Sequence, residues 1–227
     1  MELLAPAGSR QALTAAVQSG ADAVYLGGPQ FGARYSAENF TIEEMKTWVD
    51  YCHLYGVDVH VTVNTLVKEK EIESLKEYLK QLNKIGVDAL IVQDMGAAEI
   101  IKKTVPDMTL HASTQMTVTS LEGVKYLEDM GFSRVVLARE LSEKEIEHIC
   151  KNAKAEIEVF VHGAICMCYS GQCLMSSILG GRSGNRGRCA QPCRLPYDLL
   201  ENGKTVKSGY ILSPKDMALV NDLGTLK

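Results

Sequence analysis

Short runs of apolar and β-branched residues alternate along the chain with longer amphipathic stretches. The runs are bounded by Gly, Asp or other polar residues, which is typical of buried parallel strands. The predicted strands cover residues 3–5, 23–26, 57–63, 89–92, 108–111, 134–137 and 157–162. The longer stretches between them predict helices, among them 9–19, 41–54 and 72–85.

Spacing and end signals support the helices. In the third of them, Leu75, Leu79 and Leu82 fall on one face at helical spacing. Thr41 and Ser142 are each followed by acidic residues, the pattern of a hydroxyl N-cap with negative charge near the positive end of the helix dipole.

A helix-Gly-strand phrase recurs, as SGADAVYLGG at 19–28, IGVDALIVQD at 85–94 and, more loosely, MGFSRVVLAR at 130–139. Such repetition predicts an α/β fold, a TIM-like (β/α) barrel with seven of its eight units visible. An open doubly wound sheet is the alternative.

Three segments are expected along the chain. Residues 1–165 form the barrel core, and residues 166–211 form a Cys- and Arg-rich loop with a small β-hairpin at Asn202-Gly203. Residues 212–227 read as a loop and helix that begin a further barrel unit, so the barrel is expected to be incomplete at its C-terminus.

Composition and charge narrow the class of protein. The 227 residues are 46% hydrophobic and 23% charged, as in a globular protein, which excludes a fibrous or disordered chain. A net charge of -4 argues against a protein that coats nucleic acid over its whole surface, but it leaves room for a local basic patch. No apolar run reaches signal-peptide or membrane-helix length, so we expect a cytoplasmic protein without a membrane partner.

Five of the seven cysteines lie between positions 166 and 193, directly after the last predicted strand. In a reducing cytosol, such thiols are metal ligands, redox groups or buried fillers more often than disulfides. The candidate metal ligands are Cys166, Cys173, Cys189 and Cys193. Four thiolates suit either Zn2+ or an iron–sulfur cluster, and the spacing does not decide between them. Cys168 is interpreted as a buried bystander, with a substitute ligand as the alternative, and Cys52 and Cys150 are interpreted as core fillers.

Polar residues follow several predicted strands, where the active site of a (β/α) barrel lies. Those expected to orient substrate and move protons are His111, Arg139, Glu140 and His162, and those expected to bind substrate are Asn64, Gln93 and Gln115. His53, His60 and His148 are interpreted as core or surface residues.

The cysteine segment also carries Arg182, Arg186, Arg188 and Arg194, with no acidic residue among them. Guanidinium groups suit phosphate or carboxylate, so the segment is a candidate RNA-binding or carboxylate-binding loop. The alternative is a solvated cluster that offsets acidic neighbours.

Several segments carry a family resemblance: ELLAPAGSRQALTAAVQSGADAVYLGG, LHASTQMT, RVVLARELS, EVFVHGAICMCYSGQCLMSS with GGRSGNRGRCAQPCRLPYDL, and LSPKDM. Over nearly its whole length the chain resembles the peptidase U32 family, the collagenase-like proteases. The cysteine segment is most similar to a branch that hydroxylates bases of ribosomal RNA, with close relatives that act on transfer RNA.

The resemblance implies a cysteine-ligated 4Fe-4S cluster, RNA (rRNA or tRNA) as partner and prephenate as a possible co-substrate. It favours an iron–sulfur-dependent nucleobase hydroxylase. One alternative is a peptidase that uses a His162–Cys166 pair, although the sequence has neither H-E-x-x-H nor G-x-S-x-G. A second alternative is a barrel whose cysteine loop is held by a structural zinc ion. Such a protein would bind a partner without catalysing a reaction.

Overall fold

A curled sheet of seven parallel strands forms the centre of the computed structural model, which describes residues 1–33 and 37–226. The strands are hydrogen-bonded in sequence order, each one parallel to the next along the chain. They are β1 (Leu4–Pro6), β2 (Ala23–Gly27), β3 (Asp58–Val63), β4 (Ala89–Val92), β5 (Thr109–Ala112), β6 (Arg134–Val136) and β7 (Glu156–Glu158).

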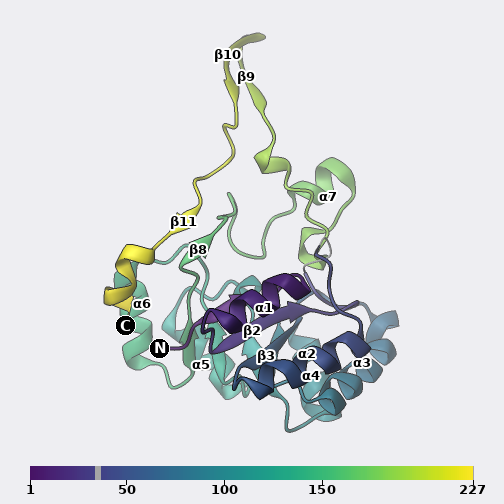
Figure 1. The fold of residues 1–227 in the computed structure, drawn as a ribbon. Coiled ribbons are helices and arrows are strands. Elements are labelled where there is room, and N and C mark those ends of the chain that lie inside the picture. The colour runs from purple at the N-terminus through teal and green to yellow at the C-terminus, as the bar shows by residue number, and fades with distance from the viewer. Residues whose placement is uncertain (34–36, 227) are drawn as a thin grey trace.

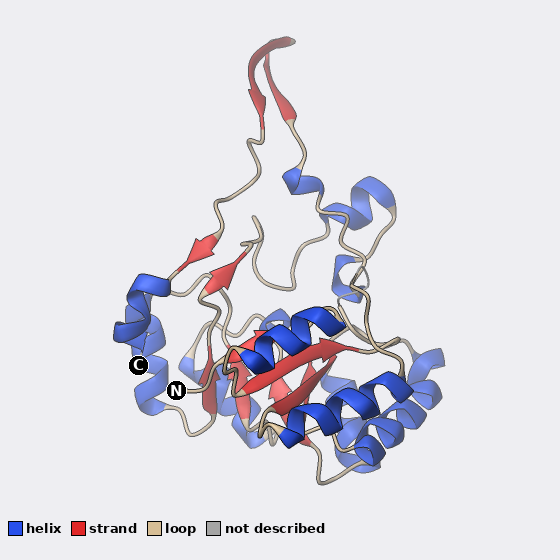
Figure 2. Ribbon diagram, in the orientation of Figure 1, coloured by secondary structure: helices blue, strands red, loops and turns tan. Residues whose placement is uncertain are grey.

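Helices follow the strands and pack along the outside of the sheet (Figure 1; Figure 2). They are α1 (Arg10–Gln18), α2 (Ile42–Leu54), α3 (Ile72–Ile85), α4 (Met95–Thr104), α5 (Leu121–Asp129) and α6 (Glu143–Asn152). The predicted fold class, an incomplete TIM-like barrel, is confirmed. A doubly wound sheet is wrong, because that fold reverses its strand order and this sheet keeps sequence order.

Local sequence explains the elements. Every residue of β4 is buried, as in a strand covered on both faces. Thr41 caps α2 in a reciprocal capping box with Glu44. In α3 the predicted leucines lie in the core, and Gly86 ends the helix in the left-handed conformation (φ 82°). Among the described residues, no helix has both the length and the apolar content needed to cross a bilayer.

The seventh strand is shorter than predicted. It ends at Glu158, and the chain then leaves the sheet, because β6 itself ends at Val136 and offers no further partner. Residues 162–163 form a separate strand, β8 (His162–Gly163), antiparallel to β11 (Met217–Ala218). The prediction that His162 ends the seventh strand is therefore wrong.

The cysteine segment continues into a projecting part of the molecule (Figure 1). This part holds α7 (Met175–Gly180), the 3-10 helices η3 (Gly184–Arg186) and η4 (Pro192–Arg194), and the hairpin of β9 (Tyr197–Glu201) and β10 (Lys204–Gly209). Asn202 (φ 50°) and Gly203 (φ 76°) form the hairpin turn, as the Asn-Gly pair predicts.

Short elements complete the described chain. The 3-10 helices η1 (Glu69–Glu71) and η2 (Thr114–Met116) follow β3 and β5, and η5 (Val220–Asp222) and α8 (Leu223–Leu226) follow β11. These last elements fall in the predicted third segment, of which residue 227 lies outside the described residues. That they begin a further barrel unit stays a prediction.

An ion-pair network joins the first strand to the last two at the N-terminal end of the barrel. Arg134, the first residue of β6, donates paired hydrogen bonds of 2.6 Å to the Glu2 carboxylate and further bonds to Glu156. Its guanidinium also lies 3.8 Å from Glu158. Burial acts to lower the pKa of Arg134, but these carboxylates outweigh it and raise the pKa. The network therefore ties β1 to β6 and β7 with a fully charged guanidinium.

Glu158 gives this network a pH dependence. Burial raises the pKa of Glu158 to about 7, and Arg134 offsets only part of the shift. The unfolded carboxyl ionises near 4.5, so the contribution of Glu158 to stability falls by about 3 kcal/mol as pH rises from about 4.5 to 7. Burial lowers the pKa of His111 to about 3, which acts in the opposite direction below pH 6.5.

We expect Glu158→Gln to stabilise the protein at neutral pH and to have little effect at pH 4.5. Urea denaturation of wild type and variant across this range measures the difference, which should grow with pH. Glu77→Gln, at an exposed position on α3, is the matched control. A difference that is the same at pH 4.5 and pH 7.5 contradicts the raised pKa.

Candidate active site at the mouth of the barrel

The turn around Ser170, within the cysteine segment, is hydrogen-bonded to two loops at the mouth of the barrel. Glu140, which follows β6, accepts a 2.9 Å hydrogen bond from the backbone N–H of buried Ser170. Thr117, which follows η2, donates from its hydroxyl to the Ser170 carbonyl (2.6 Å) and accepts from the Gln172 amide (2.9 Å). The predicted proton-handling residue Glu140 thus has a positioning contact, because it holds the backbone between Cys168 and Cys173.

Thr117 is held in an uncommon conformation. Its φ of 59° is in the left-handed region, which β-branched residues rarely adopt. Backbone strain of this kind persists where surrounding contacts hold the residue in place, and it is frequent at functional sites. Thr117 was not among the predicted site residues, and no local sequence signal marks it.

Two glycines permit close backbone approach beneath the cysteine segment. A Cβ on Gly171 (φ 78°) would lie 2.2 Å from the carbonyl oxygen of Gln115, and one on Gly187 (φ 76°) would lie 2.8 Å from the Cα of Ala33. Both positions combine a left-handed backbone with a contact that excludes any side chain. The segment therefore packs directly on the loops after β5 and β2.

The four predicted ligand thiols share one electrostatic neighbourhood. Desolvation by surrounding protein raises the pKa of the Cys166 thiol, nearby Arg139 lowers it, and Cys189, Cys193 and Cys173 raise it further. Such mutual influence requires the thiols to lie near one another, although they span 28 positions of the chain. The other three predicted ligands therefore lie within electrostatic range of Cys166.

Cys189 also accepts hydrogen bonds at sulfur. The Gln191 N–H lies 3.4 Å and the Ser176 hydroxyl 3.7 Å from its Sγ, and Ser176 is buried. Hydrogen bonds to sulfur stabilise a thiolate and tune the metal group that it binds. Ser176 is a second residue that sequence reasoning missed.

The thiols do not form a closed ligand set. Within residues 1–33 and 37–226, no three His, Cys, Asp or Glu side chains lie close enough together to coordinate a metal ion. In number and softness the four thiols fit an iron–sulfur cluster or zinc. Cys168 is half-buried and its bystander role stays a prediction, whereas Cys52 is buried in the core and Cys150 is exposed. The expectation that Cys150 fills the core is thus wrong.

Arg139 connects the barrel to the thiols. Its guanidinium lies over the ring of Phe160, 4.1 Å from the centroid, and acts electrostatically on Cys166. A stacked guanidinium retains its charge and its donors, so it can also hold an anionic group beside the thiols. The predicted placement of Arg139 at the site is therefore consistent with the structure.

The His162–Cys166 pair of the peptidase alternative lacks the features of an activated nucleophile. Across the described residues, no hydrogen bond joins the His162 ring to Cys166, and both residues are exposed. The pKa of Cys166 is raised, whereas a catalytic thiolate requires a lowered pKa.

His111 lies deeper than predicted. The strand β5 continues to Ala112, so His111 is within the strand, 4% exposed, with its ring 4.6 Å from that of His60. Burial, then His60 and Arg134, lower its pKa, so the ring is neutral at physiological pH. The prediction that His111 ends its strand is wrong, while His60 is buried as a core residue would be.

The three predicted substrate-binding amides have different partners. Asn64 accepts a 2.9 Å hydrogen bond from the Ala33 N–H, which fixes the loop after β2. The buried Oε1 atoms of Gln93 and Gln115 have no hydrogen-bond partner among the described residues. Since a buried acceptor without a donor is costly, these two amides are the ones available to a bound molecule or water.

Two of the four arginines make contacts within the protein. Arg186 pairs both of its terminal nitrogens with Glu71 (2.7 and 3.0 Å), and Arg194 donates to Ser213, to the Pro214 and Ile165 carbonyls, and to Asp216. Their assignment as RNA-binding residues is corrected, because these contacts occupy the guanidinium donors. Arg182 and Arg188 are exposed and stay candidates.

These features define an α/β barrel protein with a thiol-rich site docked on its mouth. The chain belongs to the peptidase U32 family, because the model described as "Peptidase family U32" matches residues 8–227. A 23S rRNA 5-hydroxycytidine synthase of Escherichia coli is 45% identical over 228 residues, covering 100% of this chain and 34% of that protein. A tRNA hydroxylation protein of Bacillus subtilis is 39% identical over 230 residues, covering 98% and 54%.

The chain thus spans between about a third and about half of the length of these curated relatives. Among solved structures, the U32 peptidase Mk0906 is similar with a TM-score of 0.61 and 20% identity, over 72% of this chain and 70% of that one. This likeness independently shows the fold.

Proposed function

We propose that the protein hydroxylates a nucleobase of ribosomal or transfer RNA and that Cys166, Cys173, Cys189 and Cys193 hold a 4Fe-4S cluster for this reaction. The observation that carries the proposal is the gathering of these four thiols beside Arg139 at the barrel mouth. Two relatives that cover nearly the whole chain have names that specify hydroxylation of ribosomal or transfer RNA, which supports this substrate class.

When bound, such a cluster supplies one-electron chemistry or an open iron position. The chain's own residues prepare the site for it. Glu140 and Thr117 fix the backbone at Ser170, and the Gln191 N–H and Ser176 hydroxyl stabilise negative charge on the sulfur of Cys189. The base must be unstacked to reach these groups, because an RNA helix shields its ring edge.

A small carboxylate donor, with prephenate as the candidate that the resemblance implies, completes the proposal. Arg139 acts electrostatically on Cys166, and its guanidinium is suited to a carboxylate. The exposed Arg182 offers a second cation on the same segment. We place the reaction in the cytoplasm, where RNA and reduced thiols are both present.

Nucleoside mass spectrometry tests the activity. Ribosomal and transfer RNA from cells lacking the gene should lose one hydroxylated nucleoside, and the full-length protein should restore it. RNA with an unchanged set of hydroxylated nucleosides in the deletion strain contradicts the proposal.

A further inference from the structure

An exposed tyrosine lies in the turn within the cysteine segment. Tyr169 directly follows Cys168 and is 60% exposed. The Gln172 N–H donates a 3.0 Å hydrogen bond to the Tyr169 carbonyl, which closes a tight turn. Among the described residues, none forms a hydrogen bond or a ring contact with the Tyr169 side chain. The faces of the ring are therefore free to contact a bound molecule.

The backbone of this turn is held in place on the barrel. Ser170, the next residue, is hydrogen-bonded to the loops after β6 and η2. The side-chain amide of Asn185 donates a 2.6 Å hydrogen bond to the Gly171 carbonyl. A fixed backbone lowers the entropy that is lost on binding, and a tyrosine side chain has few torsions left to order. Tyr169 is thus a preorganised aromatic contact rather than part of a loose loop.

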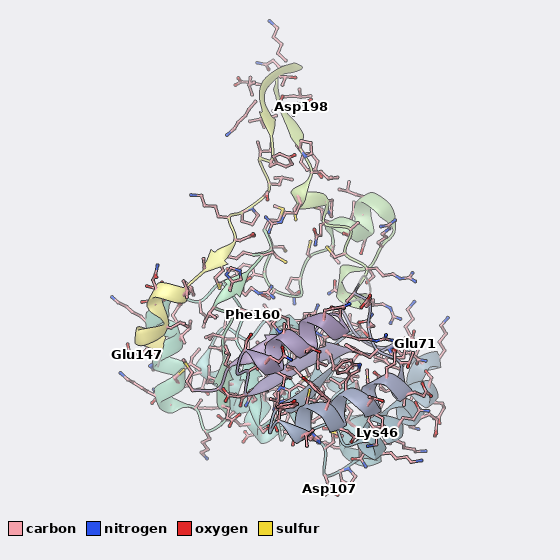
Figure 3. All side chains as sticks on the ribbon, in the orientation of Figure 1. Lys46, Glu71, Asp107, Glu147, Phe160 and Asp198 are labelled. Atoms are coloured by element: carbon pink, nitrogen blue, oxygen red, sulfur yellow. The ribbon has the colours of Figure 1, made fainter. Side chains whose placement is uncertain are left out.

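Charge is distributed unevenly between the barrel body and the part of the chain that carries this turn. Residues 162–211 hold six Lys and Arg against two Asp and Glu, a net charge of +4, whereas residues 1–161 hold sixteen against twenty-four, a net charge of -8. Figure 3 labels Asp198 on the hairpin of the basic part and Glu147 on the acidic body. The exposed cations of the basic part include Arg182, Lys204 and Lys207. A chain that is acidic overall therefore favours a polyanion on the same segment as Tyr169.

We propose that an unpaired base of the RNA stacks on the Tyr169 ring. Proteins commonly hold unpaired bases by stacking them on aromatic side chains, and this contact tolerates any base. The basic segment would attract the phosphates, while the ring would hold one base beside Cys168 and the proposed cluster ligands. This inference rests on the proposed function and adds to it the residue that positions the base.

Two single-stranded probes of equal length test the inference: an RNA oligomer of mixed sequence, and a ribose–phosphate chain without bases. Their binding to the full-length protein is measured by fluorescence anisotropy. Because both probes carry the same phosphate charge, the difference between their affinities isolates the contribution of the bases. We expect wild type to bind the RNA oligomer about tenfold more tightly than the abasic chain.

Three variants assign this difference to one ring. Tyr169→Leu should bind the RNA oligomer about tenfold more weakly than wild type and the abasic chain equally well, which also shows that the variant is folded. Tyr169→Phe keeps the ring and should bind both probes as wild type does. Tyr126→Leu is the matched control, because Tyr126 is 61% exposed but lies on α5 in the acidic body, and it should also bind as wild type does.

Three results overturn the inference. The first is wild-type affinity of Tyr169→Leu for the RNA oligomer, and the second is an equal loss of affinity in Tyr126→Leu. The third is a loss in Tyr169→Phe as large as in Tyr169→Leu, since that result assigns the contact to the hydroxyl and not to the ring.

The outcome is distinguishable from that of the proposed function. Hydroxylation of RNA by a protein whose affinity does not depend on Tyr169 rejects the stacking role and retains the enzyme. A base-dependent affinity that Tyr169→Leu removes, in a protein whose deletion alters no hydroxylated nucleoside, retains the stacking role and rejects the hydroxylase.

Discussion

Replacing Cys173 with alanine is expected to remove bound iron and RNA hydroxylation together. The thiol is one of the three that act electrostatically on Cys166, and it is one of the four proposed cluster ligands. Loss of an outer partner of a metal ligand costs about 10–100-fold, so loss of the ligand itself should exceed about 100-fold. The measurement is hydroxylated nucleoside per RNA in cells that carry the variant, together with iron in the purified protein.

Two other cysteines serve as matched controls. Cys168→Ala changes a half-buried thiol five positions away on the same segment, and Cys150→Ala changes an exposed thiol on α6. Both variants should retain iron and activity. If Cys168→Ala loses the iron and Cys173→Ala retains it, the assignment of Cys173 as a ligand is contradicted.

Removing Arg134 is expected to cause the largest loss of stability. Its guanidinium is 10% exposed and holds Glu2 and Glu156 at the base of the barrel. Deleting the guanidinium removes its hydrogen bonds to charged groups and leaves Glu158, 18% exposed, without its cation, which should cost about 1.5–3 kcal/mol. Glu2 and Glu156, at 36% and 66% exposed, are hydrated in the variant and add little to the cost. Urea denaturation of Arg134→Ala at pH 8 should show this loss.

The loss of stability in Arg134→Ala should depend on pH and on the protonation of Glu158. Arg134 lowers the pKa of Glu158, so without it the carboxyl takes up a proton more readily and the cost is smaller at pH 5 than at pH 8. Adding Glu158→Gln should recover part of the stability at pH 8. Arg10→Ala, which breaks an exposed pair with Glu44, is the control and should cost no more than about 1 kcal/mol. An Arg134 variant as stable as this control shows that the network does not hold the barrel together.

Local signals in the sequence predicted the barrel well. Strands covered on both faces consist almost entirely of apolar residues, and β4 begins and ends at the predicted residues. The capping residue of α2 and the turn at Asn202-Gly203 were likewise readable, because each depends on neighbours within a few positions. That the four thiols converge on one metal centre stays a prediction, because among the described residues no three ligand side chains lie within coordinating distance of one another.

Long-range pairing limited the prediction of individual roles. Arg186 reads as a free cation within its segment, but its partner Glu71 is 115 positions away. The place of His162 depends on β11, whose two residues have no strand signal of their own. Likewise, the docking of Ser170 by Glu140 joins residues 30 positions apart. Periodicity and spacing carry no information about such contacts.

The cluster is tested by the iron, sulfide and zinc content of the full-length protein purified without oxygen, together with its absorption spectrum. We expect about four irons and four sulfides per chain and a brown protein that absorbs near 400 nm. One zinc per chain with no colour contradicts the cluster and indicates a structural zinc site, and a metal-free protein contradicts both.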